Sequence, residues 1–296
     1  MSTAVRASTT VSTGVGVGSA HGMRRVLIFW VPLILFIVIT LFPFYWMLLA
    51  SLKANSELYS LRSFPFWVST PTLDHYKYLF EKTLYARWLV NTLIISIAST
   101  AISLAFGILA GYALARLRFR GAGILGVAVF ISYLVPQTLL FIPMFDVIKT
   151  LNIGDTYWAL ILTYPTFLIP FCTWLLMGYF KSIPKELEES AMIDGASRLR
   201  ALWDIVLPLA MPGILSAGIF AFTLSWNEFI YALVFITTTP MKTLPVGVVN
   251  ELIRGDVFFW GSLMAGALLG SVPVALIYSF FVEYYVAGLT AGAVKG

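Results

Sequence analysis

Six long segments of this chain consist almost entirely of apolar residues. Each reaches the roughly 20 residues that a helix needs to cross the hydrocarbon core of a bilayer. Backbone groups in lipid must be hydrogen-bonded within the segment, so helices are the expected form. A soluble enzyme or a secreted disulfide domain could not cover this surface, since 59% of the 296 residues are hydrophobic and only 11% are charged. The sequence therefore predicts an all-α, polytopic membrane protein with spans at residues 26–52, 88–115, 121–148, 157–180, 209–236 and 261–287.

The sequence carries no recognisable catalytic, metal-binding or nucleotide-binding motif. The phosphate-binding pattern G-x-x-x-x-G-K-[ST] does not occur, because Gly is never followed by Lys. Two histidines and the single Cys172 are too few for a metal cluster or an internal disulfide. The net charge of +5 is expected to reflect basic residues at a membrane face rather than a nucleic-acid partner. We therefore expect no cofactor or metal in this chain.

Arginines in a short loop set the predicted orientation. Arg116, Arg118 and Arg120 lie between the second and third spans, and cytoplasmic loops carry an excess of Lys and Arg. This loop and both termini are therefore expected in the cytoplasm. Residues 1–23, rich in Ser, Thr, Gly and Val, predict a disordered tail. Residues 24–287 are expected to form the six-helix domain, and residues 288–296 a cytoplasmic C-terminal tail.

Ionisable groups are nearly absent from the centres of the predicted spans. Transporters that work alone by ion coupling usually place several such groups near the bilayer midplane. Here only Glu228 is well embedded. A stand-alone secondary transporter of a small polar solute is thus the weaker alternative, and a transporter with this sequence is expected to draw its energy from another subunit.

The segment at residues 181–208, between the fourth and fifth spans, predicts two short helices joined by an elbow. Glu186, Glu188 and Glu189 lie near the positive end of the first helix dipole, which favours them electrostatically. Gly195 suits the left-handed residue that often ends a helix. Such a unit could be a lever that a partner protein moves, or a surface hairpin without a partner.

The second short helix is expected to continue toward the fifth span. Pro208 and Pro212 are expected to break or kink that path. Four residues at helical spacing predict one apolar stripe on this helix: Leu199, Leu202, Trp203 and Val206.

The spacing of this segment resembles the EAA loop of permease subunits of ABC importers. The family pattern E-A-A-x3-G-x9-I-x-L-P is matched by Glu189-Ser190-Ala191, Gly195 and 205–208, with Ser190 in place of the first alanine. Two further strings, Trp226-Asn227-Glu228-Phe229 and the ending at 286–296, resemble the carbohydrate-uptake branch of the family, specifically its maltose-type second permease.

The resemblance implies a coupling site and a set of partners. A short helix of the EAA loop is expected to dock on a cytoplasmic ATPase subunit. The implied partners are a second homologous permease, two ATPase chains that bind ATP and Mg, an external solute-binding protein, and a sugar, polyol or related carbohydrate as substrate, in a bacterial inner membrane. The implied coupling residues are Glu189, Ser190, Ala191, Asp194, Gly195, Ala196, Leu207 and Pro208.

Three further groups of residues have roles that the resemblance implies or that stay undecided between two alternatives. The last outer loop is expected to contact the binding protein through Asn250, Glu251, Arg254, Gly255 and Asp256. The C-terminal tail is expected either to reach the ATPase chains through Thr290, Gly292 and Lys295 or to be a frayed end. Trp226, Asn227 and Glu228 are expected either to stabilise the helix bundle or to line the translocation path.

Overall fold

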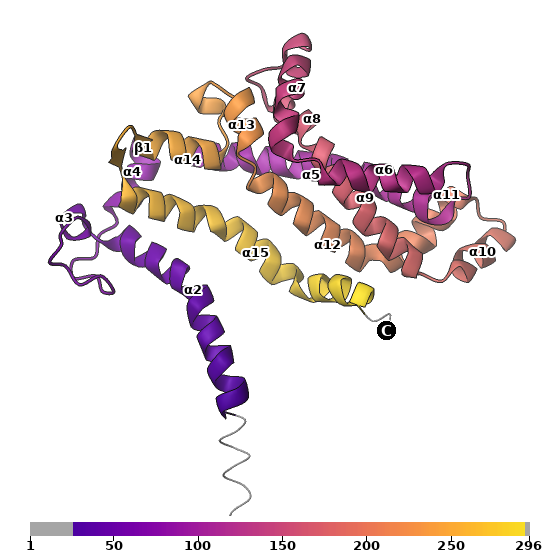
Figure 1. Cartoon of the computed structure of the whole chain (residues 1–296), viewed down its shortest axis with the longest axis horizontal. Coiled ribbons are helices and arrows are strands. Elements are labelled where there is room, and N and C mark those ends of the chain that lie inside the picture. Colours follow the sequence, from indigo (N-terminus) through magenta and orange to yellow (C-terminus); the bar gives the residue numbers. More distant parts are fainter. Residues whose placement is uncertain (1–25, 294–296) are drawn as a thin grey trace, which may run out of the picture.

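The computed structural model describes residues 26–293, with side chains from residue 27 to residue 282. The predicted N-terminal tail and Lys295 lie outside the described residues, and Thr290 and Gly292 lie where only the backbone is described. Within these limits the fold is an all-α bundle (Figure 1). Five helical segments are long and apolar enough to cross a membrane, and a bent pair of helices can supply a sixth crossing. The prediction of an all-α polytopic membrane protein is confirmed.

Four of the six predicted spans agree closely with observed helices. Each is nearly free of charge and long enough for a bilayer. Their bounds are Val26–Trp30 (η1) with Val31–Leu52 (α2), Tyr85–Arg116 (α5), Tyr157–Thr163 (α8) with Pro165–Ser182 (α9), and Trp260–Ala293 (α15).

The predicted third span is wrong as one continuous helix. It is divided into α6 (Ala122–Leu134) and α7 (Gln137–Thr150), whose axes meet at 96°. Pro136 causes the break, because a proline disfavours the helical conformation of the residue before it. Val135 accordingly has an extended backbone, with ψ of 124°.

The fifth span also departs from its prediction at both ends. The helix is continuous from Arg198 to Trp226, through α11 (Arg198–Ala201), η2 (Leu202–Val206) and α12 (Leu207–Trp226). Of the expected break or kink at Pro208 and Pro212, the break is wrong, because the helix continues through both prolines. A wide π-turn precedes the prolines, in which the N–H of Leu207 bonds to the carbonyl of Leu202. Single π-turns of this kind occur inside α-helices without ending them. After Trp226 the chain leaves the helix and resumes as α13 (Ile230–Phe235).

Several short elements lie at the two ends of the bundle, as Figure 1 shows, whereas α8 and α13 lie between those ends. We call one the coupling-loop end; it carries α10 (Lys185–Ile193), α11 and the arginine loop 117–121. We call the other the hairpin end. It carries α3 (Asn55–Leu58), α4 (Asp74–Lys82), η3 (Thr239–Met241), α14 (Leu244–Leu252) and the two-stranded antiparallel hairpin β1 (Ile253–Arg254) and β2 (Val257–Phe258).

Glycines let α5 and α9 approach closely at the centre of the bundle. A Cβ on Gly107 would lie 2.6 Å from the Cβ of Cys172, and one on Gly111 would lie 3.1 Å from the backbone nitrogen of Met177. The G-x-x-x-G spacing therefore serves close packing, as such spacings do in membrane helices. Cys172 is fully buried in this contact.

Gly107→Val is expected to destabilise the bundle by about 1–3 kcal/mol, because it overpacks a contact between two backbones. Gly178→Val on α9 is the matched control, since a Cβ there meets nothing within 4 Å. A thermal-unfolding comparison in detergent checks this. Equal midpoints for the two variants would contradict the assigned packing role.

Candidate functional site

The segment 181–208 has the expected elbow. Helix α10 ends in a Schellman motif: the N–H of Gly195 bonds to the carbonyl of Met192 at 3.1 Å, and the N–H of Ala196 to that of Ala191 at 2.9 Å. Gly195 has φ of +92°, the left-handed region that glycine adopts freely. The hydroxyl of Ser197 then accepts a hydrogen bond from the N–H of Arg200 and caps α11.

The expected coupling residues lie largely on the surface of this elbow. Glu189, Ser190, Asp194 and Gly195 are exposed, as is Pro208. The two alanines at 191 and 196 are half-buried, and only the leucine at 207 is buried. Most of this set is thus available to a partner protein.

The predicted apolar stripe of the second short helix is buried only in part. Leu202 and Val206 are buried, whereas Leu199 and Trp203 are 60% and 62% exposed. Ile193, at the end of α10, is 86% exposed. The elbow therefore presents large apolar side chains to its surroundings, which is typical of a surface that contacts another protein.

A buried polar cluster, which the sequence analysis did not find, fixes α10 to the end of α5. The hydroxyl of Tyr112 donates a hydrogen bond to the Glu188 carboxylate, and the Arg116 guanidinium lies 3.5 Å from the same carboxylate. Arg116 also donates to the carbonyl of Ile183 at 2.7 Å. Arg116 and Glu188 are only 9% and 4% exposed, so this contact joins α10 to the end of a long membrane helix through buried polar side chains. We name Tyr112, Arg116 and Glu188 the α5–α10 anchor.

The segment Trp226-Asn227-Glu228 lies at the break between α12 and α13. The Glu228 carboxylate accepts hydrogen bonds from the backbone N–H groups of Tyr231 and Ala232, at 2.8 and 3.1 Å. It therefore caps α13 within the bundle, where it is 7% exposed. Trp226 is buried and donates to the carbonyl of Gly270 at 3.1 Å, whereas Asn227 is exposed. The hydrogen bonds of Glu228 and Trp226 are thus made within the chain.

The expected docking residues of the last outer loop lie at and before the hairpin. Arg254, Gly255 and Asp256 are exposed, and Gly255 has φ of +59° in the two-residue turn. Asn250 is exposed, and Glu251 is half-buried and pairs with Arg254.

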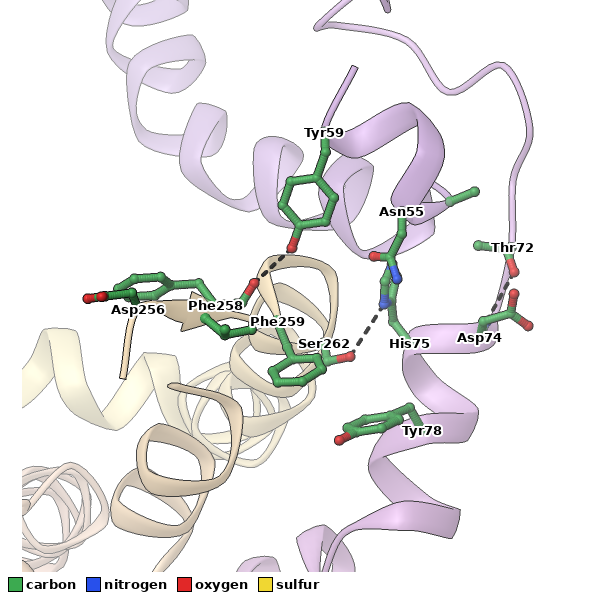
Figure 2. Close-up of a pocket in the computed structure, with 12 residues that line it drawn as sticks. Asn55, Tyr59, Thr72, Asp74, His75, Tyr78, Asp256, Phe258, Phe259 and Ser262 are labelled. Carbon is green, nitrogen blue, oxygen red and sulfur yellow. Dashed lines mark hydrogen bonds between the residues drawn. The ribbon is translucent and has the colours of Figure 1, made fainter. Parts of the chain in front are cut away.

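A cavity of about 610 Å³ lies beside this hairpin (Figure 2). It opens between the hairpin and the segment at residues 53–84, which joins α2 to α5, and the hydroxyl of Tyr59 closes one edge by donating to the carbonyl of Phe258 at 2.7 Å. The rings of Tyr78 and Phe259 stack with centroids 5.7 Å apart. Of the residues that line it, the sequence analysis had singled out only Asp256. No spacing rule could have found the others, because the loops that meet here are about two hundred residues apart.

The segment at residues 53–84 has a polar interior. The ammonium of Lys53 donates to the carbonyl of Phe64 at 2.8 Å and lies 3.8 Å from the Glu57 carboxylate. The pKa of Glu57 is held below its ordinary value, chiefly by the backbone N–H of Ser69 and also by Thr70 and Lys53, against the opposing effect of burial.

This lowered pKa predicts a loss of stability on acidification. A carboxylate with a lowered pKa in the folded state stabilises the fold above its unfolded pKa, and that stabilisation is lost as the pH falls through the folded value. Glu57→Gln should therefore lower the thermal midpoint at pH 7, and its difference from the wild type should shrink as the pH falls below the ordinary glutamate pKa. Glu81→Gln, at an exposed site on α4, is the control and should show no such convergence. A difference between Glu57→Gln and the wild type that does not change with pH would contradict the assignment.

The described residues thus form a bundle of helices long and apolar enough to cross a membrane, with a two-helix elbow at one end. Residues 103–290 match the model of a family described as "Binding-protein-dependent transport system inner membrane component". The chain belongs to this family.

Relatives and solved structures agree with this assignment. The chain is 38% identical to the inner membrane ABC transporter permease protein YcjP of Escherichia coli, over 90% of this chain and 96% of that protein. It is 35% identical to the trehalose/maltose transport system permease protein MalG of Thermococcus litoralis, over 93% and 98%. A crystal structure of a bacterial ABC transporter that imports alginate contains a similar fold, with a TM-score of 0.76, 21% identity, and coverage of 92% of this chain and 100% of that chain.

Proposed function

We propose that this chain is a permease subunit of an ATP-driven, binding-protein-dependent importer of a sugar, polyol or related carbohydrate. The observation that carries this proposal is the elbow at Gly195, whose exposed face carries the EAA residues and whose buried face is fixed to α5 by the α5–α10 anchor. Family membership supports it. So do the names of two relatives, a trehalose/maltose transport permease from Thermococcus litoralis and a sulfoquinovosyl glycerol transport permease from Agrobacterium fabrum.

Energy enters this scheme through two separate ATPase chains that bind ATP and Mg. Their closure draws together the elbow of this chain and that of a second, homologous permease. The α5–α10 anchor transmits the movement to α5, and the paired permeases change from an inward-facing to an outward-facing state. Each ligand shifts this equilibrium only by its differential affinity for the two states.

The unburied apolar surface of α2 is evidence for a second membrane protein as a partner. Helix α2 diverges from the other helices and meets the bundle mainly along α15 (Figure 1). None of the 18-residue apolar core of this span is buried within the chain. A helix that is apolar all round and unburied needs lipid or a partner helix around it. In the assembled importer, lipid and the second permease fill these positions.

At the opposite end, the hairpin with Arg254, Gly255 and Asp256 receives the solute-binding protein. The exposed turn and the adjacent aromatic cavity give that partner a structured contact surface. Trp226, Asn227 and Glu228 remain candidates for the translocation path. The contacts of Glu228 favour its structural role as a cap.

A stand-alone secondary transporter is the alternative. The embedded Glu228 is the residue that such a mechanism would need, and its carboxylate is already engaged by two backbone N–H groups. This contact favours the subunit of a larger assembly.

Reconstitution tests the proposal. The chain is placed in proteoliposomes with and without a second permease, the ATPase chains and the binding protein, and uptake of radiolabelled trehalose, maltose and galacto-oligosaccharides is measured. Uptake should require ATP and every partner, and the chain alone should not hydrolyse ATP. Solute uptake by the chain alone, driven by an ion gradient, would favour the secondary transporter.

The orientation proposed is that of an inner-membrane protein with both termini in the cytoplasm. The arginine loop carries this assignment through the excess of Lys and Arg on cytoplasmic sides. A reporter fused after Arg120 should read as cytoplasmic, and one fused after Lys149 as external. The reverse pattern would invert the orientation.

A further inference from the structure

A basic cavity lies beside the α5–α10 anchor, at the coupling-loop end. Its volume is about 480 Å³, and it opens between the last turn of α5, the arginine loop, and the beginnings of α10 and α11. Half of its lining residues are cationic: it is lined by Arg116, Leu117, Arg118, Lys185, Glu188, Glu189, Met192 and Arg198.

The positive charge of this cavity is not balanced within the described part of the chain. Glu188 is paired with Arg116 inside the anchor. No ion pair joins Arg118, Lys185 or Arg198 to a carboxylate among the described residues, and Glu189 is the one remaining acidic residue in the lining. The lining therefore keeps a surplus of positive charge.

Arg116 adds a second, independent indication of a ligand. Its side chain is 2% exposed and its Nε lies 3.5 Å from the Glu188 carboxylate, yet its Nη1 atom has no hydrogen-bond acceptor. A buried donor without an acceptor is unfavourable, and more so when it is charged. An anion in the cavity that this side chain lines would supply an acceptor for the N–H groups of Nη1.

The geometry suits a phosphate group in particular. The planar fork of a guanidinium matches the oxygens of a phosphate, and three of the cations here are arginines. Arg116 is the last residue of α5, so the cavity lies where that helix reaches the membrane surface. Basic pockets between helices at the cytoplasmic face bind anionic lipid head groups.

We propose that this cavity binds a phosphate group, held by Arg118, Lys185 and Arg198 with Arg116 at its base. The occupant links three elements, because Arg118 belongs to the arginine loop, Lys185 to α10 and Arg198 to α11. It therefore stabilises the coupling elbow against α5, whichever solute the importer carries. An anionic phospholipid and free phosphate offer the same group, and the experiment has one arm for each.

The test compares a charge-neutralised cavity with a matched surface control. The cavity variant is Arg118→Gln with Arg198→Gln. The control is Arg120→Gln with Arg200→Gln, which removes the same charge at the same end from exposed residues outside the lining. In the lipid arm, the full chain in detergent is titrated with phosphatidylglycerol and, separately, with phosphatidylcholine, and bound lipid is counted by native mass spectrometry. In the phosphate arm, the thermal midpoint is measured in inorganic phosphate and in chloride of equal ionic strength.

We expect the cavity variant to bind the phosphate-bearing ligand at least about tenfold more weakly than the wild type, because two charge-assisted contacts are lost. The control should bind as the wild type does. If the wild type binds phosphatidylglycerol in preference to phosphatidylcholine and phosphate does not shift its midpoint, the occupant is a lipid. If only phosphate shifts the midpoint, the occupant is the free anion. Either result supports the proposal. Equal binding by the wild type and the cavity variant in both arms would overturn it. A misfolded cavity variant is recognised by its gel-filtration profile, and Lys185→Gln then replaces it.

Discussion

Glu188→Ala is expected to abolish coupled uptake and to lower the free energy of unfolding by about 3–5 kcal/mol, because it leaves a buried guanidinium without its carboxylate. Arg116 is 9% exposed and gains little compensation from water. The hydroxyl of Tyr112 loses its acceptor in the same variant. With its one buried charge removed, α10 is no longer fixed to α5.

Two control variants separate loss of stability from loss of coupling. Glu186→Ala changes an exposed glutamate on the same helix and should leave both the thermal midpoint and uptake near the wild-type values. The double variant Arg116→Met with Glu188→Leu removes both charges, and apolar replacement of a buried ion pair is often neutral or stabilising.

We expect the double variant to regain most of the thermal stability. The measurements are unfolding midpoints in detergent and ATP-dependent uptake in proteoliposomes with the partner chains. If Glu188→Ala unfolds and transports as the wild type does, the α5–α10 anchor has no mechanical role.

The membrane helices could be predicted because an apolar segment of about 20 residues can lie in lipid only if every backbone group is hydrogen-bonded within it. A helix meets this requirement, so the apolar segments indicate helices directly. The failures occurred where a single residue changed the path of the chain. Pro136 divides the predicted third span, although Asp146 is the only charged residue in it. Conversely, Pro208 and Pro212 do not interrupt the fifth helix, because a π-turn precedes them. Hydropathy averages side-chain polarity over a window, so it cannot predict local backbone geometry of this kind.

The elbow at Gly195 could be predicted from local rules, whereas the α5–α10 anchor could not. Adjacent residues on a helix point about 100° apart, so only one of Glu188 and Glu189 can face the bundle. The sequence offers no means of telling which, because the partner Arg116 is 72 positions away. Tertiary contact makes Glu188 the buried member and leaves Glu189 exposed. Likewise, the cavity beside the hairpin exists only because distant loops meet there.

Gly195→Val is expected to uncouple ATP hydrolysis from uptake while the protein still inserts in the membrane. A Cβ at this position meets nothing within 4 Å, so the effect is one of backbone conformation rather than of space. A residue other than glycine in the left-handed region costs about 1–2 kcal/mol, and a β-branched residue is among the least suited to it. The strained turn relaxes by releasing the bonds that end α10, and α11 then leaves its position relative to the α5–α10 anchor.

Gly121→Val is the matched control for this prediction, because Gly121 has nearly the same φ, +91°, and equally open space, but lies before α6. Both valine variants should lose similar stability, and only Gly195→Val should lower the number of solute molecules imported per ATP hydrolysed. Gly195→Asn should retain most of the coupling, since asparagine tolerates the left-handed region better than other residues with a side chain. The measurement is the ratio of solute uptake to ATP hydrolysis in proteoliposomes for each variant. A Gly195→Val importer with the same ratio as Gly121→Val would show that the elbow transmits no force, since an equal strain would then have an equal effect wherever it is placed.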